Sequence, residues 1–481
     1  MSKNLEKSKS DIAKKNGHTY LQWIFALLAN CTHLAYGLEC GWISPTTKTL
    51  QSETSPSGYP LSDGQIAGVA SSMSTAATCV VIMHSYIADI YGRKINIIII
   101  AFLEALSWII RIFCTSFTSL VIARVCAGIA AGGCYNVIPM YIKEISREDL
   151  RGILCTFSMV FQNVGVFIMY FIGAYLDYYT VMYVIVGLPI LTMLGMILAP
   201  ESPEFLVKQG KIDQAIETVA FVRGLDKDDT TVQTIVEVMV KDAAHFKSLP
   251  NLTLLSIMKN KIWRRGYILI MIAFTFYEIN GAFAIITYAS TVINSTGIEF
   301  EISPDIQSLS FPVVMMTGSL VLASCVERIG RKTLLIGAYI VSSLCMFGLA
   351  IIIILHNQVG GVPGWLPIIL MMMVLAMYSG GVCPVTFLIL TEMFNFQIRA
   401  KLMSLVVTYG WLLTAILLNI YLPLSNALGV YAPFIIYGFS NLGGVFFTIF
   451  YLTETKGKSD TQILQDLMRR KKTDNEISCI E

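Results

Sequence analysis

The sequence predicts an all-α membrane protein in which twelve transmembrane helices form two bundles of six. Of its 481 residues, 55% are hydrophobic and only 14% are charged, whereas soluble proteins carry about 25% charged residues. Such a chain cannot cover its own surface with polar groups, so lipid must be the solvent for much of it. Apolar runs of about 20 residues, the length that crosses a bilayer, recur along the sequence. The landmarks of the first half also return in the second.

The apolar runs fall into two sets of six. The first six predicted spans lie near 20–43, 65–89, 95–116, 118–142, 153–175 and 180–199. The second six lie near 264–290, 307–326, 333–355, 364–392, 401–423 and 431–452. Spans 7 and 10 contain Gly281 and the pair Gly380-Gly381, so we expect these two helices to bend or break.

A polar stretch at 200–263 separates the bundles at 20–199 and 264–452, and polar tails at 1–19 and 453–481 flank them. Amphipathic patterns within the stretch predict a helical linker, with helices near 204–209, 213–222 and 231–246. Composition leaves two interpretations open. The linker is either a solvated connection or a plate that latches the two halves.

The charges predict the orientation of the chain. All but three of the 34 Lys and Arg residues lie in segments or helix ends that face the cytoplasm if the N-terminus is inside. The exceptions are Lys48, Arg111 and Arg124. By the positive-inside rule, both termini and the linker are predicted to be cytoplasmic in a multi-pass protein.

Several function classes have no signature in the sequence. The 11 cysteines are scattered through apolar runs without a CxxC or Cys/His pattern, which indicates neither a metal site nor a disulfide framework. We find no nucleophile elbow, phosphate loop or carboxylate dyad, so we expect neither an enzyme nor a cofactor. No nucleic-acid partner is indicated, and membrane lipid is the expected surrounding.

Three landmarks occur in the same order in both halves. The first two are Asp-Ile-Tyr-Gly-Arg-Lys at 89–94 and Glu-Arg-Ile-Gly-Arg-Lys at 327–332, and a Glu followed seven residues later by an Arg (144 and 151; 392 and 399). The third is Pro-Glu-Ser-Pro-Glu at 200–204, matched by Thr-Glu-Thr-Lys-Gly at 453–457. We therefore predict a duplicated six-helix unit. Parallel repeats of this kind are a standard transporter architecture, with the substrate bound near the midplane between the halves.

Acids and bases accompany each other at these landmarks, on the cytoplasmic ends of the helices. They could pair across the two halves when a transporter faces outward and separate when it opens inward, so that a network of weak pairs biases the equilibrium. The alternative is ordinary positive-inside anchoring. The candidate network consists of Asp89, Arg93, Glu144, Arg151, Glu327, Arg331, Glu392 and Arg399.

Together with further motifs, the landmarks resemble the sugar-porter family of the major facilitator superfamily over roughly residues 20–465. The further motifs are Pro-Met-Tyr-Ile-Lys-Glu at 139–144, Arg-Gly at 151–152, Pro-Glu-Ser-Pro at 200–203 and Glu-Thr-Lys-Gly-Lys-Ser at 454–459. Within the family, Gly-Trp-Ile-Ser-Pro at 41–45 is most similar to the insect-type facilitated trehalose and hexose transporters. The resemblance implies the major facilitator fold, alternating access, a saccharide substrate, the cell membrane, and function as a monomer.

The resemblance also implies a substrate site, from which this chain departs. Gln162 matches a glutamine that hydrogen-bonds sugar, Trp411 an aromatic residue of the cavity, and Tyr288 a gate tyrosine. Where the family has Gln-Gln-x-x-Gly-x-Asn in helix 7, this chain has Tyr-Glu-Ile-Asn-Gly-Ala-Phe at 277–283. The substrate-binding candidates are Gln162, Glu278, Asn280, Tyr288, Phe387 (in place of a tryptophan) and Trp411.

The loss of these amides bears on the substrate, because each unpaired buried hydroxyl of a sugar costs roughly 1–3 kcal/mol. Either another set of residues recognises a sugar, or the substrate is not an ordinary hexose. The leading hypothesis is a transporter of trehalose or hexose, facilitative or coupled to protons. The alternatives are a transporter of a polyol, a glycoside or a charged metabolite, and a transport-dead sugar sensor on the same fold.

Ionisable residues inside membrane spans are candidates for function. Glu39 and Arg124 fall where proton-coupled sugar porters carry an acid and its arginine partner, so they are our candidate coupling pair. A purely structural pairing is the alternative. We expect Glu104 and Arg111 to pair along one helix, with Arg111 extending outward. Asn294 begins a glycosylation sequon in a predicted external loop.

Overall fold

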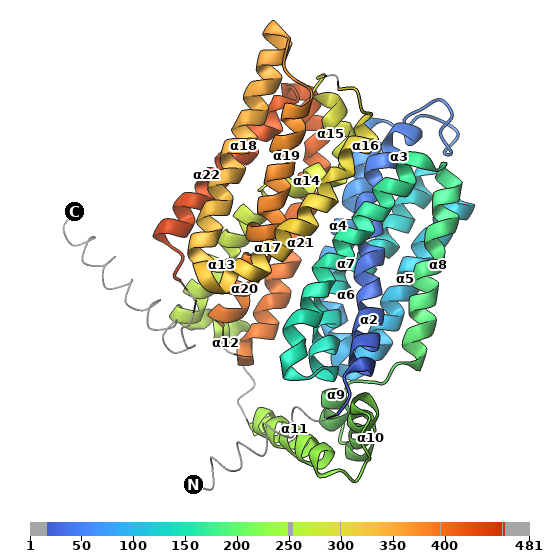
Figure 1. The fold of residues 1–481 in the computed structure, drawn as a ribbon, viewed down its shortest axis with the longest axis vertical. Helices are drawn as coiled ribbons and strands as arrows, with labels where there is room; N and C mark the ends of the chain where they lie inside the picture. Colours follow the sequence, from blue (N-terminus) through green and yellow to red (C-terminus); the bar gives the residue numbers. More distant parts are fainter. Residues whose placement is uncertain (1–16, 249–253, 299, 395, 455, 457–481) are drawn as a thin grey trace, which may run out of the picture.

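The computed structural model describes residues 17–248, 254–298, 300–394, 396–454 and 456, which form a helical molecule of two halves standing side by side (Figure 1). Most of the predicted tails, 1–16 and 457–481, lies outside the described residues, and so does the side chain of Glu327. Ten of the described helical segments are long and apolar enough to span a membrane. The helices α2 and α17 complete the twelve predicted spans.

The first half is built from long helices joined by short polar turns. Its helices are α2 (Tyr20–Gly41), α3 (Ile43–Leu50), α4 (Asp63–Ile90), α5 (Arg93–Phe113), α6 (Phe117–Ile145), α7 (Glu148–Tyr175) and α8 (Tyr178–Leu198). Side chains in the turns start the next helix by accepting hydrogen bonds from its first backbone N–H groups. Ser62, Ser116 and Asp177 do so for α4, α6 and α8. The Thr180 hydroxyl and N–H donate to Asp177 and lower the pKa of its carboxyl.

The second half repeats the arrangement with two interrupted helices. Its segments are α13 (Lys261–Glu278), α14 (Ala282–Thr287), α15 (Ala289–Ser295), α16 (Pro304–Ser308), α17 (Ser310–Ile329), α18 (Arg331–Val359), α19 (Trp365–Met377), η1 (Tyr378–Val382), α20 (Cys383–Met393), α21 (Phe396–Leu428) and α22 (Tyr431–Phe450). Span 7 breaks between Glu278 and Ala282, where Gly281 adopts a φ of +93°. Span 10 contains the π-helical turn η1, which includes Gly380 and Gly381. Both expected interruptions are confirmed.

Four short helices connect the halves: α9 (Pro203–Lys208), α10 (Ile212–Arg223), α11 (Thr230–Ser248) and α12 (Leu254–Lys259). The first three coincide with the predicted amphipathic patterns and bury a small apolar core of their own around Ala215 and Val232. They lie beneath the first half in Figure 1, where Phe221 packs against Phe25 of α2. We call this end of the molecule the linker end and the opposite end, at α3, α15 and α16, the far end.

The predicted sequence repeat is also a repeat of geometry at the linker end. In the first half, Glu144 lies 2.9 Å from Arg93, and Glu201 accepts hydrogen bonds from the backbone N–H groups of Arg93 and Lys94. The same contacts recur in the second half, with Arg331 on Glu392 at 2.9 Å and the N–H groups of Arg331 and Lys332 on Glu454. The Lys94 and Lys332 ammonium groups each donate to a backbone carbonyl at 2.8 Å. Duplication of the six-helix unit therefore extends to individual hydrogen bonds.

Gly92 and Gly330 make these repeated contacts possible. Their φ angles of +103° and +96° favour glycine. A Cβ at Gly92 would overlap the Glu201 carboxylate, and one at Gly330 would lie 2.9 Å from a Glu454 oxygen. Both alanine variants add backbone strain of roughly 1–3 kcal/mol. Gly92→Ala also displaces the Glu201 carboxylate from the N–H groups of Arg93 and Lys94, so we expect it to lower the thermal unfolding midpoint in detergent more than Gly330→Ala does. Gly152→Ala, with no atom within 4 Å of the new methyl group, is the control. Equal midpoints for all three variants would contradict this account.

The halves meet along a seam formed by α4 and α21. Polar pairs join these two helices from end to end: Asp63 with Asn426, Ser71 with Asn419, and Ser85 with Ser404. Helix α7 faces α17 across the other side of the interface. This arrangement encloses a space between the halves at mid-height.

Candidate functional site

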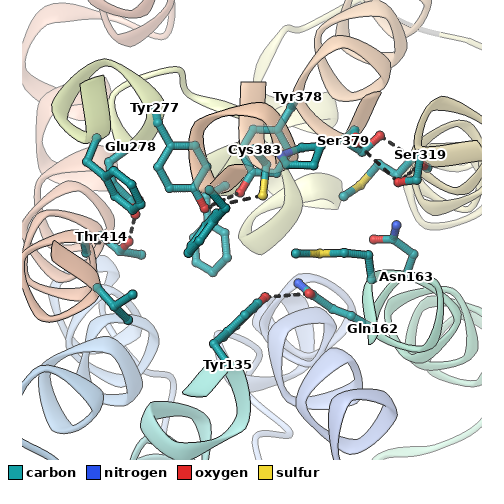
Figure 2. Close-up of a pocket in the computed structure, with 18 of the residues that line it drawn as sticks. Tyr135, Gln162, Asn163, Tyr277, Glu278, Ser319, Tyr378, Ser379, Cys383 and Thr414 are labelled. Atoms are coloured by element: carbon teal, nitrogen blue, oxygen red, sulfur yellow. Dashed lines mark hydrogen bonds between the residues drawn. The ribbon is translucent and has the colours of Figure 1, made fainter. Parts of the chain in front are cut away.

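A pocket lies between the two halves near the middle of the long helices, and Figure 2 shows the side chains that point into it. Its side chains leave about 60 Å³ of free space. The first half contributes residues of α2, α6 and α7, and the second half those of spans 7, 8, 10 and 11. The lining residues are Tyr36, Tyr135, Met159, Gln162, Asn163, Phe274, Tyr277, Glu278, Phe283, Met315, Ser319, Tyr378, Ser379, Cys383, Pro384, Phe387, Val407, Gly410, Trp411 and Thr414.

The polar groups of the pocket are held by one another. On the side of the first half, the Tyr135 hydroxyl donates to Gln162 Oε1 at 2.6 Å. On the side of the second half, the Thr414 hydroxyl donates to Glu278 Oε2 at 2.7 Å. The interruption of span 7 places Glu278 at the end of α13, from which its side chain reaches the pocket (Figure 2). Amide, hydroxyl and carboxylate groups from both halves thus face one small space.

Aromatic rings form much of the remaining wall. Trp411 packs against Tyr36 and Tyr135, with ring centroids 6.1 and 6.3 Å apart. Phe387 lies 5.2 Å from Phe274 and stacks on Tyr135 at 6.4 Å. A wall of aromatic faces with a few convergent polar groups is typical of small-molecule sites.

The pocket continues mainly toward the linker end, whereas the void that adjoins it on the far-end side, beside Leu418, measures about 10 Å³. A second cavity of about 400 Å³ shares Met159, Ser319, Ser379, Pro384 and Phe387 with it. That cavity runs between α7 and α20 down to Cys155 and Thr391, which lie nearer the linker end. The site is therefore reached between the halves from the linker end.

Contacts between the halves close the far end. The Tyr170 hydroxyl of α7 donates to the Ile286 carbonyl of α14. The Ser44 hydroxyl of α3 lies 3.2 Å from the Ser290 hydroxyl, which in turn donates to Asp305 at 2.6 Å. Side chains of α3, α7, α14 and α15 thus block a path from the far end to the pocket.

Four of the six predicted substrate-binding residues line the pocket: Gln162, Glu278, Phe387 and Trp411. Asn280 does not, because its side chain is fully buried and donates to Asn441 on α22. Tyr288 does not either. It stacks on Tyr421 and donates to the Leu418 carbonyl at 3.0 Å, above the pocket. Glu278 and Tyr288 do not share one helical face, because span 7 is not one continuous helix.

Sequence reasoning missed several residues of the wall, above all Tyr135, Tyr277 and Tyr378. The hydroxyls of Tyr277 and Tyr378 lie 3.2 Å apart. Tyr277 precedes Glu278 in the altered helix 7 motif, and this replacement of an amide was the one available signal. Tyr135 and Tyr378 stand in apolar runs outside the motifs that point to the site, so nothing in the sequence distinguishes them.

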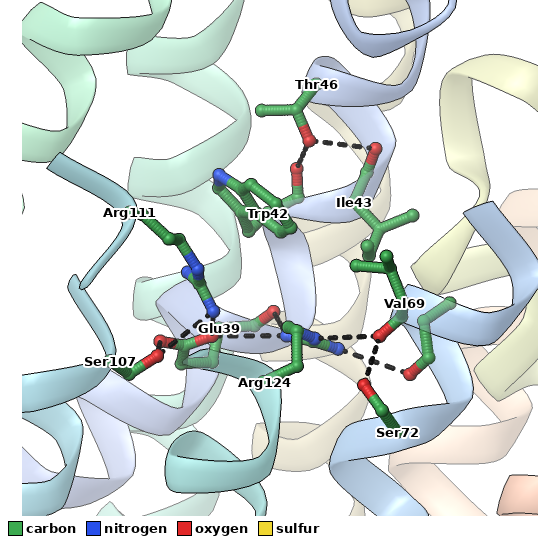
Figure 3. A network of polar contacts seen from close by, with 10 residues as sticks. Glu39, Trp42, Ile43, Thr46, Val69, Ser72, Ser107, Arg111 and Arg124 are labelled. Carbon is green, nitrogen blue, oxygen red and sulfur yellow. Dashed lines mark hydrogen bonds and ion pairs between the residues drawn. The ribbon is translucent and has the colours of Figure 1, made fainter. Parts of the chain in front are cut away.

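A buried ionic cluster lies on the far-end side of the pocket within the first half (Figure 3). Glu39 Oε2 lies 2.6 Å from an Arg111 nitrogen and 3.1 Å from Arg124 Nη1. Its other oxygen accepts from the Ser107 hydroxyl at 3.0 Å, and Arg124 also donates to the Glu39 carbonyl at 2.7 Å. The predicted neighbours Glu39 and Arg124 are thus brought together, with a second arginine that was not predicted.

The expected position of Arg111 is wrong. Its side chain does not extend outward but is fully buried, and the guanidinium lies over the rings of Trp42 and Trp108 at 4.2 and 4.3 Å. Such stacking on aromatic faces stabilises a desolvated cation. The expected pairing with Glu104 is also wrong, because Glu104 instead lies 3.9 Å from the Cys134 thiol. Arg111 thus pairs with Glu39 of helix α2 and not with Glu104 on its own helix α5.

The candidate network at the linker end pairs within each half. Arg93 contacts Glu144 and, at 3.8 Å, Asp89, and Arg331 contacts Glu392. The two remaining arginines hold backbone carbonyls of their own half. Arg151 donates to Ser146 at 3.1 Å and Arg399 to Phe394 at 3.0 Å. At the far end, the glycosylation candidate Asn294 is exposed in the last turn of α15.

Comparison with known proteins agrees with this architecture. The family model described as "Sugar (and other) transporter" matches residues 25–467. The facilitated trehalose transporter Tret1 of Aedes aegypti is 25% identical over 94% of this chain, which spans 56% of that protein. The Tret1 of Polypedilum vanderplanki is 24% identical over 94% of this chain and 89% of that protein.

Solved structures share the fold. The xylose transporter XylE from E. coli, in a partially occluded inward open conformation, superposes with a TM-score of 0.75 over 92% of this chain and 100% of that chain, at 21% identity. XylE bound to 6-bromo-6-deoxy-D-glucose, described as a major facilitator superfamily proton:xylose symporter, gives 0.72 over 94% and 100%, at 22% identity. The fold is therefore the twelve-helix major facilitator fold, and the chain belongs to the sugar (and other) transporter family.

Proposed function

We propose that this protein carries a saccharide of the trehalose or hexose class across a membrane by alternating access. The observation that carries the proposal is the pocket between two repeat-related halves, which is closed at the far end and continues to the linker end. To close the linker end and open the far end, the halves need only rock about the seam of α4 and α21. Repeat-related halves of this kind move largely as rigid bodies.

The composition of the pocket supports a saccharide. Gln162, Asn163 and Ser319 offer donors and acceptors, and Trp411 and Phe387 offer ring faces for the apolar faces of a sugar. The relatives named for facilitated trehalose transport and the structure of XylE with a glucose derivative point to the same substrate class. We assign substrate contacts to Gln162, Glu278, Phe387 and Trp411, and a far-end gate to Tyr288.

We further propose that transport is facilitative. A proton on Glu39 would leave Arg111 and Arg124, which are at most 1% exposed, without their shared carboxylate. Separating a buried charge from its partner costs about 3–5 kcal/mol, and here two cations lose the same partner. The cluster therefore favours a structural role for Glu39 over proton uptake during the cycle.

The distribution of charge supports an orientation with the linker end in the cytoplasm, in the cell membrane. Arg93, Lys94, Arg147, Arg331 and Lys332 all lie at that end, as the positive-inside rule requires of the cytoplasmic side. We infer that the pairs of Arg93 with Glu144 and of Arg331 with Glu392 keep each half rigid. We assign the pairing of acids and bases between the two halves to the outward-facing state.

Uptake by cells that lack endogenous hexose transport tests the proposal, with labelled trehalose and labelled glucose at acidic and at neutral pH. Gln162→Ala is expected to lower kcat/KM by about 10-fold, because it removes one hydrogen-bonding amide worth roughly 1–3 kcal/mol. Gln214→Ala, at an exposed position of α10, is the matched control and should transport as the unaltered protein does. Uptake should not depend on pH.

Each outcome decides a different part of the proposal. Uptake by the unaltered protein that is stimulated by acid would replace the facilitative proposal by proton symport. Equal uptake by Gln162→Ala and by the unaltered protein would remove Gln162 from the substrate site. If protein shown to be at the cell surface takes up neither sugar, then the proposal of trehalose or an ordinary hexose as the substrate fails.

A further inference from the structure

Glu278 carries the one carboxyl side chain among the described residues that line the central pocket. No Lys, Arg or His stands among those twenty lining residues to balance it. The hydrogen bond described for its carboxylate is the one from Thr414 to Oε2, which comes from a neutral hydroxyl. An ionised Glu278 would therefore face the pocket without a cationic side chain to balance it.

The surroundings of Glu278 keep this charge directed at the pocket. Gly410 on α21 leaves room for the carboxylate, because a Cβ there would lie 2.9 Å from Glu278 Oε1. Glu278 is also the last residue of α13, and the C-terminal end of a helix carries a partial negative charge of about half an elementary charge. The carboxylate and the helix end favour the same ligand, a cation.

Aromatic faces surround the space beside this carboxylate. Tyr277 and Tyr378 stack with centroids 5.8 Å apart and an interplanar angle of 9°. Phe274 and Phe387 meet edge to face beside Tyr277. Ring faces attract a desolvated ammonium group, and aromatic walls joined by a carboxylate are a recurrent way to bind one. Figure 2 shows Tyr277, Glu278 and Tyr378 around one side of the pocket, opposite Gln162 and Asn163.

We propose that the substrate is a saccharide that carries a protonated amino group, with Glu278 as the counter-ion of the ammonium. This inference rests on the proposed function and names the substrate class of the same site. The amides of Gln162 and Asn163 face the hydroxyls of the sugar from the first half. The ammonium lies between the Glu278 carboxylate and the rings of Tyr277 and Tyr378. A substrate with hydroxyl groups alone offers no counter-charge, so the Glu278 carboxyl could ionise beside it only at a high cost in a dry pocket.

Reconstituted full-length protein tests this with three labelled sugars that share the glucose ring: D-glucosamine, N-acetyl-D-glucosamine and D-glucose. Uptake into proteoliposomes is measured at slightly acidic pH, where the free amine is protonated. We expect D-glucosamine to be preferred, and Glu278→Gln to lower its kcat/KM by about 10-fold or more. The two neutral probes should change by less than about 3-fold. Glu301→Gln, the same change at an exposed position in a far-end loop, should keep the preference.

Glu278→Asp shows whether charge or shape matters, since it keeps the carboxylate at a shorter reach and should keep the preference with lower affinity. Binding is measured in parallel as the rise in thermal midpoint caused by each probe. An unchanged ratio of D-glucosamine to D-glucose in Glu278→Gln would overturn the inference while leaving sugar transport intact. If none of the three probes is transported or raises the midpoint, then the proposed function itself fails.

Discussion

Replacing Glu39 by glutamine is expected to destabilise the protein more than any other single change considered, and to abolish transport. The substitution keeps the size of the side chain but leaves two buried guanidinium groups, those of Arg111 and Arg124, without a carboxylate. Removing one partner of a buried ion pair costs about 3–5 kcal/mol. We measure thermal unfolding in detergent as the loss of the monodisperse peak in size-exclusion chromatography, and expect the midpoint of the variant to be lower by several degrees.

A second substitution identifies the cause. In the double variant Glu39→Gln with Arg111→Gln, one of the two unpaired charges is gone, so part of the lost stability should return. Glu53→Gln, at an exposed acid of the far end, controls for the loss of a negative charge as such. A Glu39→Gln midpoint equal to that of the unaltered protein would mean that the two arginines do not depend on the carboxylate of Glu39, and the argument for facilitative transport would fail with it.

The positions of the helices could be predicted because hydropathy records them directly. Each described long helix lies within a few residues of a predicted span, and even the interruption at Gly281 follows from a glycine in a long apolar run. The linker helices α9, α10 and α11 were predictable for the same reason, since their amphipathic period is visible without a structure. Local rules suffice for features that one segment determines alone.

Contacts between segments were harder to predict. Arg111 and Glu104 stand seven residues apart on α5, which suggests a pair along the helix, yet Arg111 instead binds Glu39 of α2 and stacks on Trp42. Asn280 and Tyr288 belong to the same span as Glu278, but neither lines the pocket. A break of three residues turns α14 relative to α13 and sends Asn280 toward Asn441. These outcomes depend on tertiary packing, which the sequence of one helix does not contain.

A disulfide between positions 44 and 290, made by Ser44→Cys together with Ser290→Cys, is expected to abolish transport. Ser44 on α3 belongs to the first half and Ser290 on α15 to the second, and their hydroxyl oxygens lie 3.2 Å apart at the closed far end. The sulfur atoms of cysteines at these two positions would therefore lie close to each other, and we expect them to form a disulfide when oxidised. A molecule locked in this way can admit substrate from the linker end but cannot open at the far end. We expect uptake to fall by more than about 10-fold under oxidant, as alternating access requires.

Reductant should restore uptake, and each single-cysteine variant should be unaffected by the oxidant. The single variants also control for Cys79 and Cys114, which are exposed in the unaltered protein. If the cross-linked protein still transports at the normal rate, the far end does not have to open and alternating access between these two halves is wrong. If transport stops when the disulfide forms and returns when the disulfide is reduced, then the contacts of Ser44 and Ser290 belong to a gate that must separate in every cycle.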